Sequence, residues 1–136
     1  MSRMTFAILT LSAAGLLAGC VEEPTPANTV FAENCAACHG ADGRGNGPAA
    51  DGLGVNVPDL TVLAANNGGQ FPWEKVMSTI DGYSRGAHQA RVMPEFGATE
   101  DLGDMVVFEV GDGNGIPVPR QLLAMAQYLE SIQRAE

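Results

Sequence analysis

Three residues that can form covalent or metal bonds lie within five positions of the chain, at Cys35, Cys38 and His39. A thiolate is a nucleophile and a soft metal ligand, and imidazole is the commonest metal ligand among side chains. Two cysteines separated by two residues can form a redox-active disulfide, supply half of a zinc site, or bond to the vinyl groups of a haem. The spacing therefore indicates redox or metal chemistry.

The complete run from Cys35 to His39 reads Cys-Ala-Ala-Cys-His, which is the attachment signature of c-type haem. On one helical turn both sulfurs reach the same edge of the porphyrin, and the next residue places its imidazole beneath the iron. A thioredoxin-like pair would need a preceding strand, which the flanking sequence lacks. A zinc site would need further ligands, but there is no second cysteine pair and His88 is the only other histidine. The sequence therefore favours one covalently bound haem c.

The first 19 residues are predicted to be a lipoprotein signal peptide. Arg3 precedes an uncharged apolar run, Phe6–Ala18, whose 13 residues are fewer than the about 20 that span a membrane. The run ends in Leu17-Ala18-Gly19-Cys20, which resembles the lipobox of bacterial lipoproteins. This resemblance implies cleavage after Gly19 and a lipid on the sulfur of Cys20. The alternative is an ordinary signal peptide that is cleaved elsewhere.

The remaining chain is predicted to comprise a polar tether, residues 20–27, and one domain, residues 28–136. With Cys20 lipidated and the other two cysteines on haem, no thiol is left over. The chain has 16 acidic and 7 basic residues, and removal of Arg3 would leave 6 basic residues and a net charge of −10. This charge argues against nucleic acid and anionic lipid as partners, and favours a protein with a basic docking patch.

Apolar spacing and helix-capping residues predict the secondary structure. A first helix is expected from Asn28 to Cys35, with Asn28 or Thr29 as the N-cap, followed by a glycine-rich loop over residues 40–58. A second helix is expected over Pro72–Ile80. Residues 99–110 fit a helix, although their Val-Val-Phe run also fits a strand. A last helix begins near Pro119 and carries an apolar stripe formed by Leu122, Met125, Leu129 and Ile132.

These motifs together resemble the bacterial class I, mono-haem cytochromes c. The likeness consists of the haem run with its continuation to Pro48, the segments Pro58–Thr61 and Met93–Gly97, and a closing helix that ends in Tyr128-Leu129. It implies an all-α cytochrome c fold, in which short helices and long Gly-rich loops wrap around one covalently bound haem. It also implies that Phe31 meets Tyr128 where the first and last helices cross.

The resemblance further implies the axial ligands of the iron. His39 would be the proximal ligand, with its ring N–H donated to the carbonyl of Pro48. Met93 would supply the distal thioether, and the proline that follows it would fix the local backbone. His88 and an open coordination position are the alternatives to Met93.

The other methionines of the predicted domain are less suitable ligands. Met77 and Met125 fall within predicted helices and are interpreted as packing residues, whereas the role of Met105 is ambiguous. Contacts to the haem propionates are another open point. The candidates for such contacts are Trp73, Tyr83, Arg85 and Arg91.

An iron with two axial ligands has no free position for a substrate, so the sequence predicts a single-electron carrier and not an enzyme. It would serve an exported respiratory or photosynthetic chain, lipid-anchored through Cys20 on the periplasmic side of a bacterial membrane. Its partner would be a quinol-oxidising complex, a dehydrogenase or an oxidase. The alternatives are a haem subunit of one membrane-associated dehydrogenase or oxidase and, less favoured, a haem peroxidase or gas sensor. Residues 98–118 look long for the family and are a candidate partner-specific surface.

Overall fold

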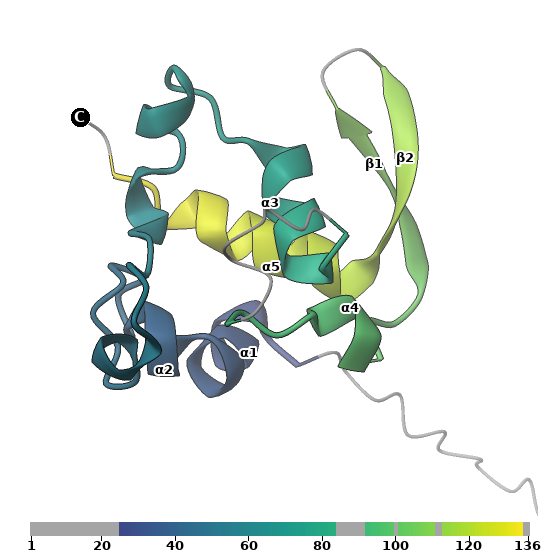
Figure 1. Ribbon diagram of the computed structural model, residues 1–136. Helices are drawn as coiled ribbons and strands as arrows, with labels where there is room; N and C mark the ends of the chain where they lie inside the picture. Colours follow the sequence, from purple (N-terminus) through teal and green to yellow (C-terminus); the bar gives the residue numbers. More distant parts are fainter. Residues whose placement is uncertain (1–24, 84–91, 100, 111–112, 135–136) are drawn as a thin grey trace, which may run out of the picture.

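Helix α5 (Arg120–Ser131) crosses the middle of the molecule, and helices α1 (Ala27–Asn34) and α3 (Trp73–Asp81) both pack against it (Figure 1). The structure is a computed structural model that describes residues 25–83, 92–99, 101–110 and 113–134. The predicted signal peptide and Cys20 lie outside the described residues. Among the described residues, no helix is both long and apolar enough to cross a membrane.

The predicted last helix is confirmed, and so is its apolar stripe except for Ile132, which is the C-cap and only partly buried. Helix α5 begins directly after Pro119, whose φ of −59° suits the residue before a helix. Its buried side chains recur every three or four residues, so they share one face. They are Leu122, Met125, Ala126 and Leu129. This face forms the centre of the core.

Helix α1 begins one residue earlier than predicted, and its N-cap lies two or three residues earlier. The expected N-cap, Asn28 or Thr29, is wrong, because Pro26 is the N-cap and its carbonyl accepts hydrogen bonds from the backbone N–H groups of Thr29 (2.9 Å) and Val30 (3.1 Å). No side-chain cap is present at this end of the helix. Val30 and Phe31 are buried against the core.

Helix α3 covers the predicted Pro72–Ile80 segment with its start and end shifted by one residue. Pro72 is the N-cap instead of the first helical residue, and the left-handed Gly82, with φ of 95°, ends the helix. The buried side chains of this helix are Val76, Met77 and Ile80. Met77 is therefore a packing residue, as expected.

The helix considered for residues 99–110 is wrong, and the alternative of a strand is confirmed. A four-residue helix, α4 (Phe96–Thr99), precedes strand β1 (Met105–Val110), which pairs antiparallel with β2 (Asn114–Pro119). β-branched and aromatic residues in β1 alternate between a packed and an exposed face, which stabilises a strand better than a helix. The fold is therefore helical with one added hairpin, and the all-α expectation omits that hairpin.

The two faces of the hairpin differ in their surroundings. Val106 pairs with Val118 and Phe108 with Ile116, and this face lies on the core, with Val118 buried. The ring centroid of Phe108 lies 4.9 Å from that of Trp73 at the start of α3. The opposite face carries Val107, which is 72% exposed. Figure 1 shows the hairpin at one edge of the molecule.

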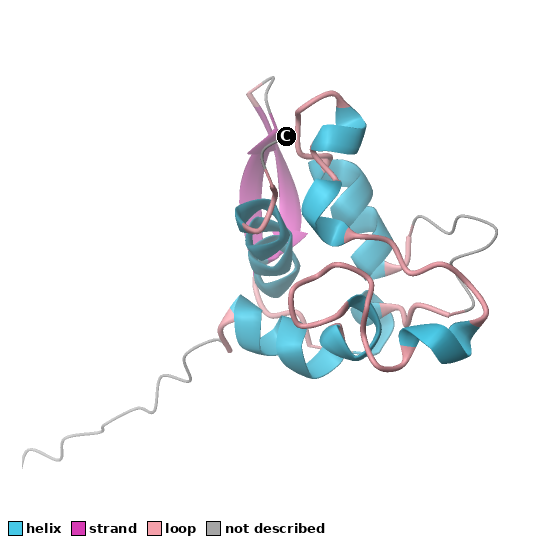
Figure 2. Ribbon diagram, turned by 90° about the vertical axis from the view of Figure 1, so that its left-hand side faces the viewer, coloured by secondary structure: helices cyan, strands magenta, loops and turns pink. Residues whose placement is uncertain are grey.

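The segment between the first helices and α3 is a series of loops and single turns, which Figure 2 shows from the front. The short helix α2 (Ala36–His39) is followed by three 3₁₀ turns, η1 (Ala50–Leu53), η2 (Leu60–Val62) and η3 (Ala65–Asn67). The predicted Gly-rich loop over residues 40–58 is thus confirmed, with one turn inside it.

Candidate functional site

Cys35, Cys38 and His39 lie on one helical turn at the junction of α1 and α2. The carbonyl of Cys35 accepts hydrogen bonds from the backbone N–H groups of Cys38 (3.1 Å) and His39 (2.9 Å). Residues three apart on a helix lie on the same side, so the two thiols share one edge of the turn. Both are free thiols and partly buried. The local structure therefore has the arrangement that attachment to a single flat group requires.

The Cys35 thiol differs from the nucleophilic thiol of a redox dithiol. Burial, and to a smaller extent the neighbouring Cys38, raise the pKa of the Cys35 thiol to about 11. Catalytic thiols of disulfide oxidoreductases instead have lowered pKa values, because the thiolate is the nucleophile. This observation disfavours the thioredoxin-like alternative.

The imidazole of His39 is buried, with 9% of the residue exposed, and its ring is oriented by a backbone carbonyl. Its Nδ1 atom lies 3.4 Å from the carbonyl oxygen of Pro58. A carbonyl can only accept, so this contact is a hydrogen bond in the tautomer that carries the proton on Nδ1 and leaves the lone pair on Nε2. Burial lowers the pKa of His39 despite the opposing effect of this hydrogen bond, and so favours the neutral form that binds metals.

The predicted hydrogen bond from His39 to Pro48 is not found, because Pro58 takes that place. Pro48 is exposed, and it follows a glycine that is held against the backbone of the turn. The N–H of Gly47 donates to the carbonyl of Cys38 (3.1 Å), and a Cβ at Gly47 would collide with the carbonyl of Ala37. This contact holds the chain next to Pro48 against the backbone of the turn.

A second glycine contact brings the later segment close to the histidine. Gly45 donates its N–H to the carbonyl of His39 (2.7 Å), and a Cβ at Gly45 would meet the carbonyl of Val57. The chain at Val57 and Pro58 therefore passes over Gly45 and reaches the imidazole. The sequence contains both prolines, but their spacing does not tell which one the folded loop brings to the ring.

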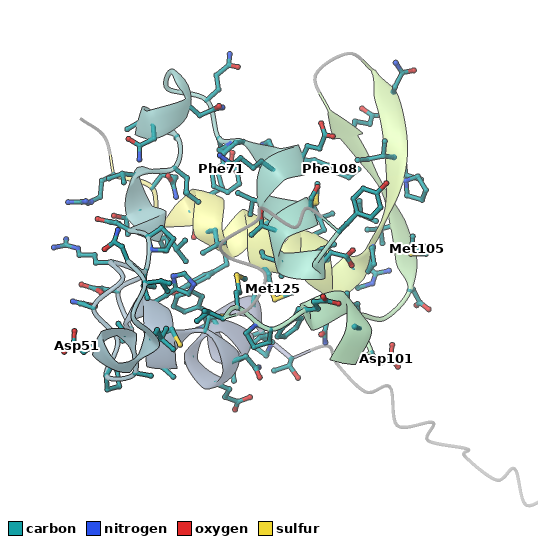
Figure 3. All side chains as sticks on the ribbon, in the orientation of Figure 1. Asp51, Phe71, Asp101, Met105, Phe108 and Met125 are labelled. Carbon is teal, nitrogen blue, oxygen red and sulfur yellow. The ribbon has the colours of Figure 1, made fainter. Side chains whose placement is uncertain are left out.

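The methionines fall into three different environments. Met77 and Met125 are buried in helices, and Figure 3 shows Met125 in the interior of the molecule. Met105 is 60% exposed on the outer face of the hairpin (Figure 3), which disfavours it as a buried ligand. Met93 lies outside the helices, is partly buried, and packs against the same hydrophobic core as Cys35. His88 lies outside the described residues.

Two of the four candidates for contacts with the haem propionates, Trp73 and Tyr83, lie within the described residues. Trp73 packs edge-on against Phe71, with ring centroids 5.0 Å apart, and also contacts Phe108. It is therefore at least a packing residue. Tyr83 is 88% exposed. Arg85 and Arg91 lie outside the described residues.

The residues of this site fit a covalently attached haem. Two free thiols lie on the same turn as a buried neutral imidazole whose Nε2 is available to a metal. Among the described residues, no large side chain is less than 2% exposed. A core made only of side chains usually contains several such residues, whereas a core completed by a flat apolar group need not.

Comparison with protein families supports the same interpretation of these residues. The family model described as cytochrome c matches residues 25–133, which include the helical turn, the loop and α5. The family implies covalently bound haem c and haem-based electron transfer, and its domains are typically extracytoplasmic. Neither the curated proteins nor the solved structures gave a match. Over most of its length, from the start of α1 to the end of α5, the chain belongs to the cytochrome c family.

Proposed function

We propose that this protein is an exported, lipid-anchored bacterial class I cytochrome c with one haem, which carries single electrons. The observation that carries the proposal is the turn from Cys35 to His39, with its two free thiols and the Nε2 atom of His39 available. The match of residues 25–133 to the cytochrome c family supports it. The haem supplies a reversible one-electron couple when bound.

The chain's own residues hold and enclose that group. Cys35 and Cys38 would hold the haem through thioether bonds, each thiol adding across one vinyl group with its proton going to the adjacent vinyl carbon. His39 and Met93 would hold the iron, which would leave no position for a substrate. A thioether ligand from Met93 would favour the reduced state and raise the reduction potential.

The proposed location rests on the N-terminal sequence. Residues 1–19 are the signal peptide, Cys20 receives the lipid, and residues 20–27 connect it to the domain over residues 28–136. Several acyl chains on one cysteine give stable membrane binding, which a single chain does not. The protein would thus stay on the periplasmic side of the membrane, close to membrane-bound redox partners.

The proposed partner carries a basic docking patch, as a quinol-oxidising complex, a dehydrogenase or an oxidase can. The excess of 16 acidic over the 6 basic residues that remain without Arg3 would steer the encounter and raise its rate at low ionic strength. At physiological salt the steering acts over about 8 Å.

A second candidate is a permanent haem subunit of one membrane-associated dehydrogenase or oxidase. The observation that favours it is the outer face of the hairpin, where Met105 and Val107 are 60% and 72% exposed. The two side chains are two residues apart in β1 and so lie on the same face, and contiguous exposed apolar patches mark sites of protein contact.

One preparation tests both candidates. The full chain is produced in a bacterium that attaches haem c, and the mass of the product and a haem-stained denaturing gel measure covalent attachment. Cys35→Ser/Cys38→Ser should lose the stain. The native protein is then released from its own membranes with mild detergent and sized. A free carrier elutes alone, whereas a subunit co-elutes with an oxidoreductase. Haem that is lost on acid–acetone extraction of the unsubstituted protein would refute covalent attachment.

A further inference from the structure

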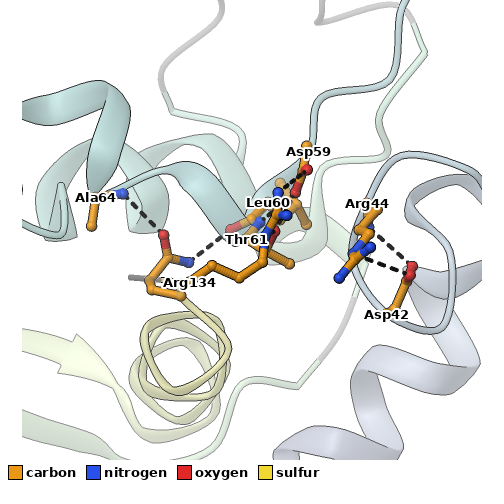
Figure 4. Close-up of polar contacts among 8 residues, drawn as sticks. Asp42, Arg44, Asp59, Leu60, Thr61, Ala64 and Arg134 are labelled. Carbon is orange, nitrogen blue, oxygen red and sulfur yellow. Dashed lines mark hydrogen bonds and ion pairs between the residues drawn. The ribbon is translucent and has the colours of Figure 1, made fainter. Parts of the chain in front are cut away.

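The C-terminal end of the chain is hydrogen-bonded to the segment that orients His39. Arg134 Nη2 lies 2.8 Å from Asp59 Oδ2, and Arg134 Nε donates to Thr61 Oγ1 at 2.7 Å. The backbone N–H of Arg134 also donates to the carbonyl of Thr61, at 2.8 Å. We call these three residues the C-terminal clamp (Figure 4). Two side-chain contacts and one backbone contact fix a single relative position of the two segments.

Asp59 and Thr61 are themselves held in one conformation. Asp59 Oδ1 accepts from the backbone N–H of Thr61 (2.8 Å) and from its hydroxyl (2.6 Å), which caps turn η2. Thr61 is 3% exposed. Both carboxylate oxygens of Asp59 are therefore occupied, one within the segment and one by Arg134.

The neighbouring Gln133 ties the same segment to α5. Its Oε1 accepts from the N–H of Ala64 (2.9 Å), and its Nε2 donates to the carbonyls of Leu60 (2.7 Å) and Leu129 (2.7 Å). The segment from Asp59 to Ala64 is thus hydrogen-bonded to the end of the chain along its whole length. Within this set of contacts, those of the clamp are the nearest in sequence to Pro58.

Pro58 directly precedes Asp59, and its carbonyl is the group that His39 Nδ1 contacts at 3.4 Å. This is a long distance for an N–H···O hydrogen bond, so a small displacement of Pro58 would break it. An acceptor on Nδ1 makes the imidazole a stronger donor through Nε2, which favours the oxidised state of a bound metal. The position of this carbonyl therefore affects the reduction potential.

We propose that Arg134 is a positioning residue that, through Asp59 and Thr61, holds the Pro58 carbonyl on His39 and so lowers the reduction potential. This inference rests on the proposed function, because it requires that His39 ligates the haem iron. Arg134 touches neither His39 nor the iron, and it acts only through the clamp.

The positioning effect and a simple charge effect have opposite signs. A cation near the iron disfavours the more positive oxidised state, so removing the charge of Arg134 alone would lower the potential. Loosening Pro58 would raise the potential, because the imidazole would become a weaker donor. The direction of the shift therefore identifies the mechanism.

The test measures the reduction potential of the full-length, haem-loaded protein in detergent. Arg134→Gln removes the two side-chain contacts of Arg134 together with its charge, and Thr61→Val removes the clamp hydroxyl without changing charge or shape. Both should raise the potential by less than about 59 mV, which corresponds to a tenfold change in the equilibrium constant of a one-electron couple. Arg134→Lys retains the charge but cannot reproduce both side-chain contacts of Arg134, so it should also raise the potential, without the opposing effect of a lost charge.

Arg44→Gln is the matched control for the lost charge. Arg44 pairs with Asp42, at 3.4 Å between Nε and Oδ2, and it also acts electrostatically on Asp59. Its substitution should leave the potential unchanged or lower it. The Nδ1 proton of His39, followed by NMR in the reduced protein, should exchange faster with water in Thr61→Val and Arg134→Gln but not in Arg44→Gln.

The two ways in which the test can fail are distinguishable. An unchanged or lowered potential in folded, haem-loaded Thr61→Val would overturn the inference and leave the proposed function intact. If Arg134→Gln does not accumulate, the potentials of Thr61→Val and Arg134→Lys decide between the same two outcomes. An unsubstituted chain that attaches no haem would overturn the proposed function and this inference together.

Discussion

The ring of Phe31 on α1 packs against the ring of Tyr128 on α5, with the ring centroids 5.2 Å apart and the planes inclined at 49°. This contact confirms that the first and last helices cross at these two residues. The contact joins the first and the last helix of the domain. Most of the chain lies between these two helices in sequence, including the haem-binding turn that follows α1. Phe31 is 4% exposed, so its whole ring contributes to the core.

We expect Phe31→Ala to lower the free energy of unfolding by about 3–5 kcal/mol, because it removes a buried ring and leaves a cavity. Tyr128→Phe keeps the ring contact and should cost less than about 1 kcal/mol. Denaturant unfolding of the haem-loaded protein measures both. A double-mutant cycle that combines Phe31→Ala with Tyr128→Ala, which removes the second ring, should give a coupling of about 0.5–1.5 kcal/mol between the rings. A cost below about 1 kcal/mol for Phe31→Ala would contradict this view of the core.

Substitutions on the two faces of the hairpin should differ in how much they destabilise the domain. Phe108→Ala removes a ring that packs against Trp73 and should destabilise the domain by about 2–4 kcal/mol, at the lower end for a partly buried site. Val107→Ser changes a neighbouring side chain that is 72% exposed, and should alter stability by no more than about 0.5 kcal/mol. Thermal unfolding of both variants checks the contrast. Equal losses of stability in the two variants would contradict the strand register, which places these two side chains on opposite faces of the hairpin.

The parts of the fold that depend on local spacing could be predicted from the sequence. Helix α5 has an apolar residue at every third or fourth position, and α3 has a proline before it and a glycine after it. Both helices can therefore be recognised from the sequence alone. The segment over residues 99–110 could not be assigned, because an apolar run of that length suits a helix or a strand. Only the antiparallel partner, Asn114–Pro119, decides between them.

The candidate site is predictable where its residues are adjacent, as in the run from Cys35 to His39. The family resemblance assigns the hydrogen bond of His39 to Pro48, whereas the folded loop brings Pro58, 19 residues away in sequence, to the ring. The clamp joins Arg134 to Asp59, which lie 75 residues apart in sequence. Such pairs leave no local pattern, because the contact depends on where α5 ends relative to the loop.

The stability of the domain in acid should depend on Asp59. Hydrogen bonds from Thr61, together with Arg134 and Arg44, lower the pKa of Asp59 below its ordinary value of 3.8. A carboxylate with a lowered pKa stabilises the folded state above its unfolded pKa, and this contribution is lost as the pH falls through the folded pKa. At about pH 6, where the carboxylate is ionised in both states, Asp59→Asn should therefore be less stable than the unsubstituted protein. The difference should shrink below pH 3.8.

Unfolding in denaturant at a series of pH values measures this difference. Asp51→Asn is a suitable control, because Asp51 lies exposed in the loop and Figure 3 shows it at the edge of the molecule. Its substitution should leave the pH profile unchanged. A constant difference between Asp59→Asn and the parent protein at every pH would show that the ionised carboxylate does not provide the stabilisation.

Lipidation makes a separate prediction about where the protein is found. Cys20→Ser should release a soluble cytochrome with an unchanged haem spectrum, because the core of the described domain is formed by residues that follow the tether. Fractionation of cells into membrane and soluble parts, followed by haem staining, measures the release. If Cys20→Ser remained on membranes after a high-salt wash, the anchor would lie elsewhere.

The ligand role proposed for Met93 can be tested against the exposed Met105. The oxidised protein should show the weak charge-transfer absorption of an iron–thioether bond, and Met93→Ala should abolish it, lower the reduction potential and allow carbon monoxide to bind the reduced iron. Met105→Ala changes a side chain that is 60% exposed, so the absorption band and the potential should stay as they are. His88→Ala should also leave the band in place. Loss of the band in His88→Ala or Met105→Ala, with retention in Met93→Ala, would assign the ligand to the other residue. Ready binding of carbon monoxide by the unsubstituted protein would instead favour a sensor or an enzyme over an electron carrier, because it requires an open or displaceable position on the iron.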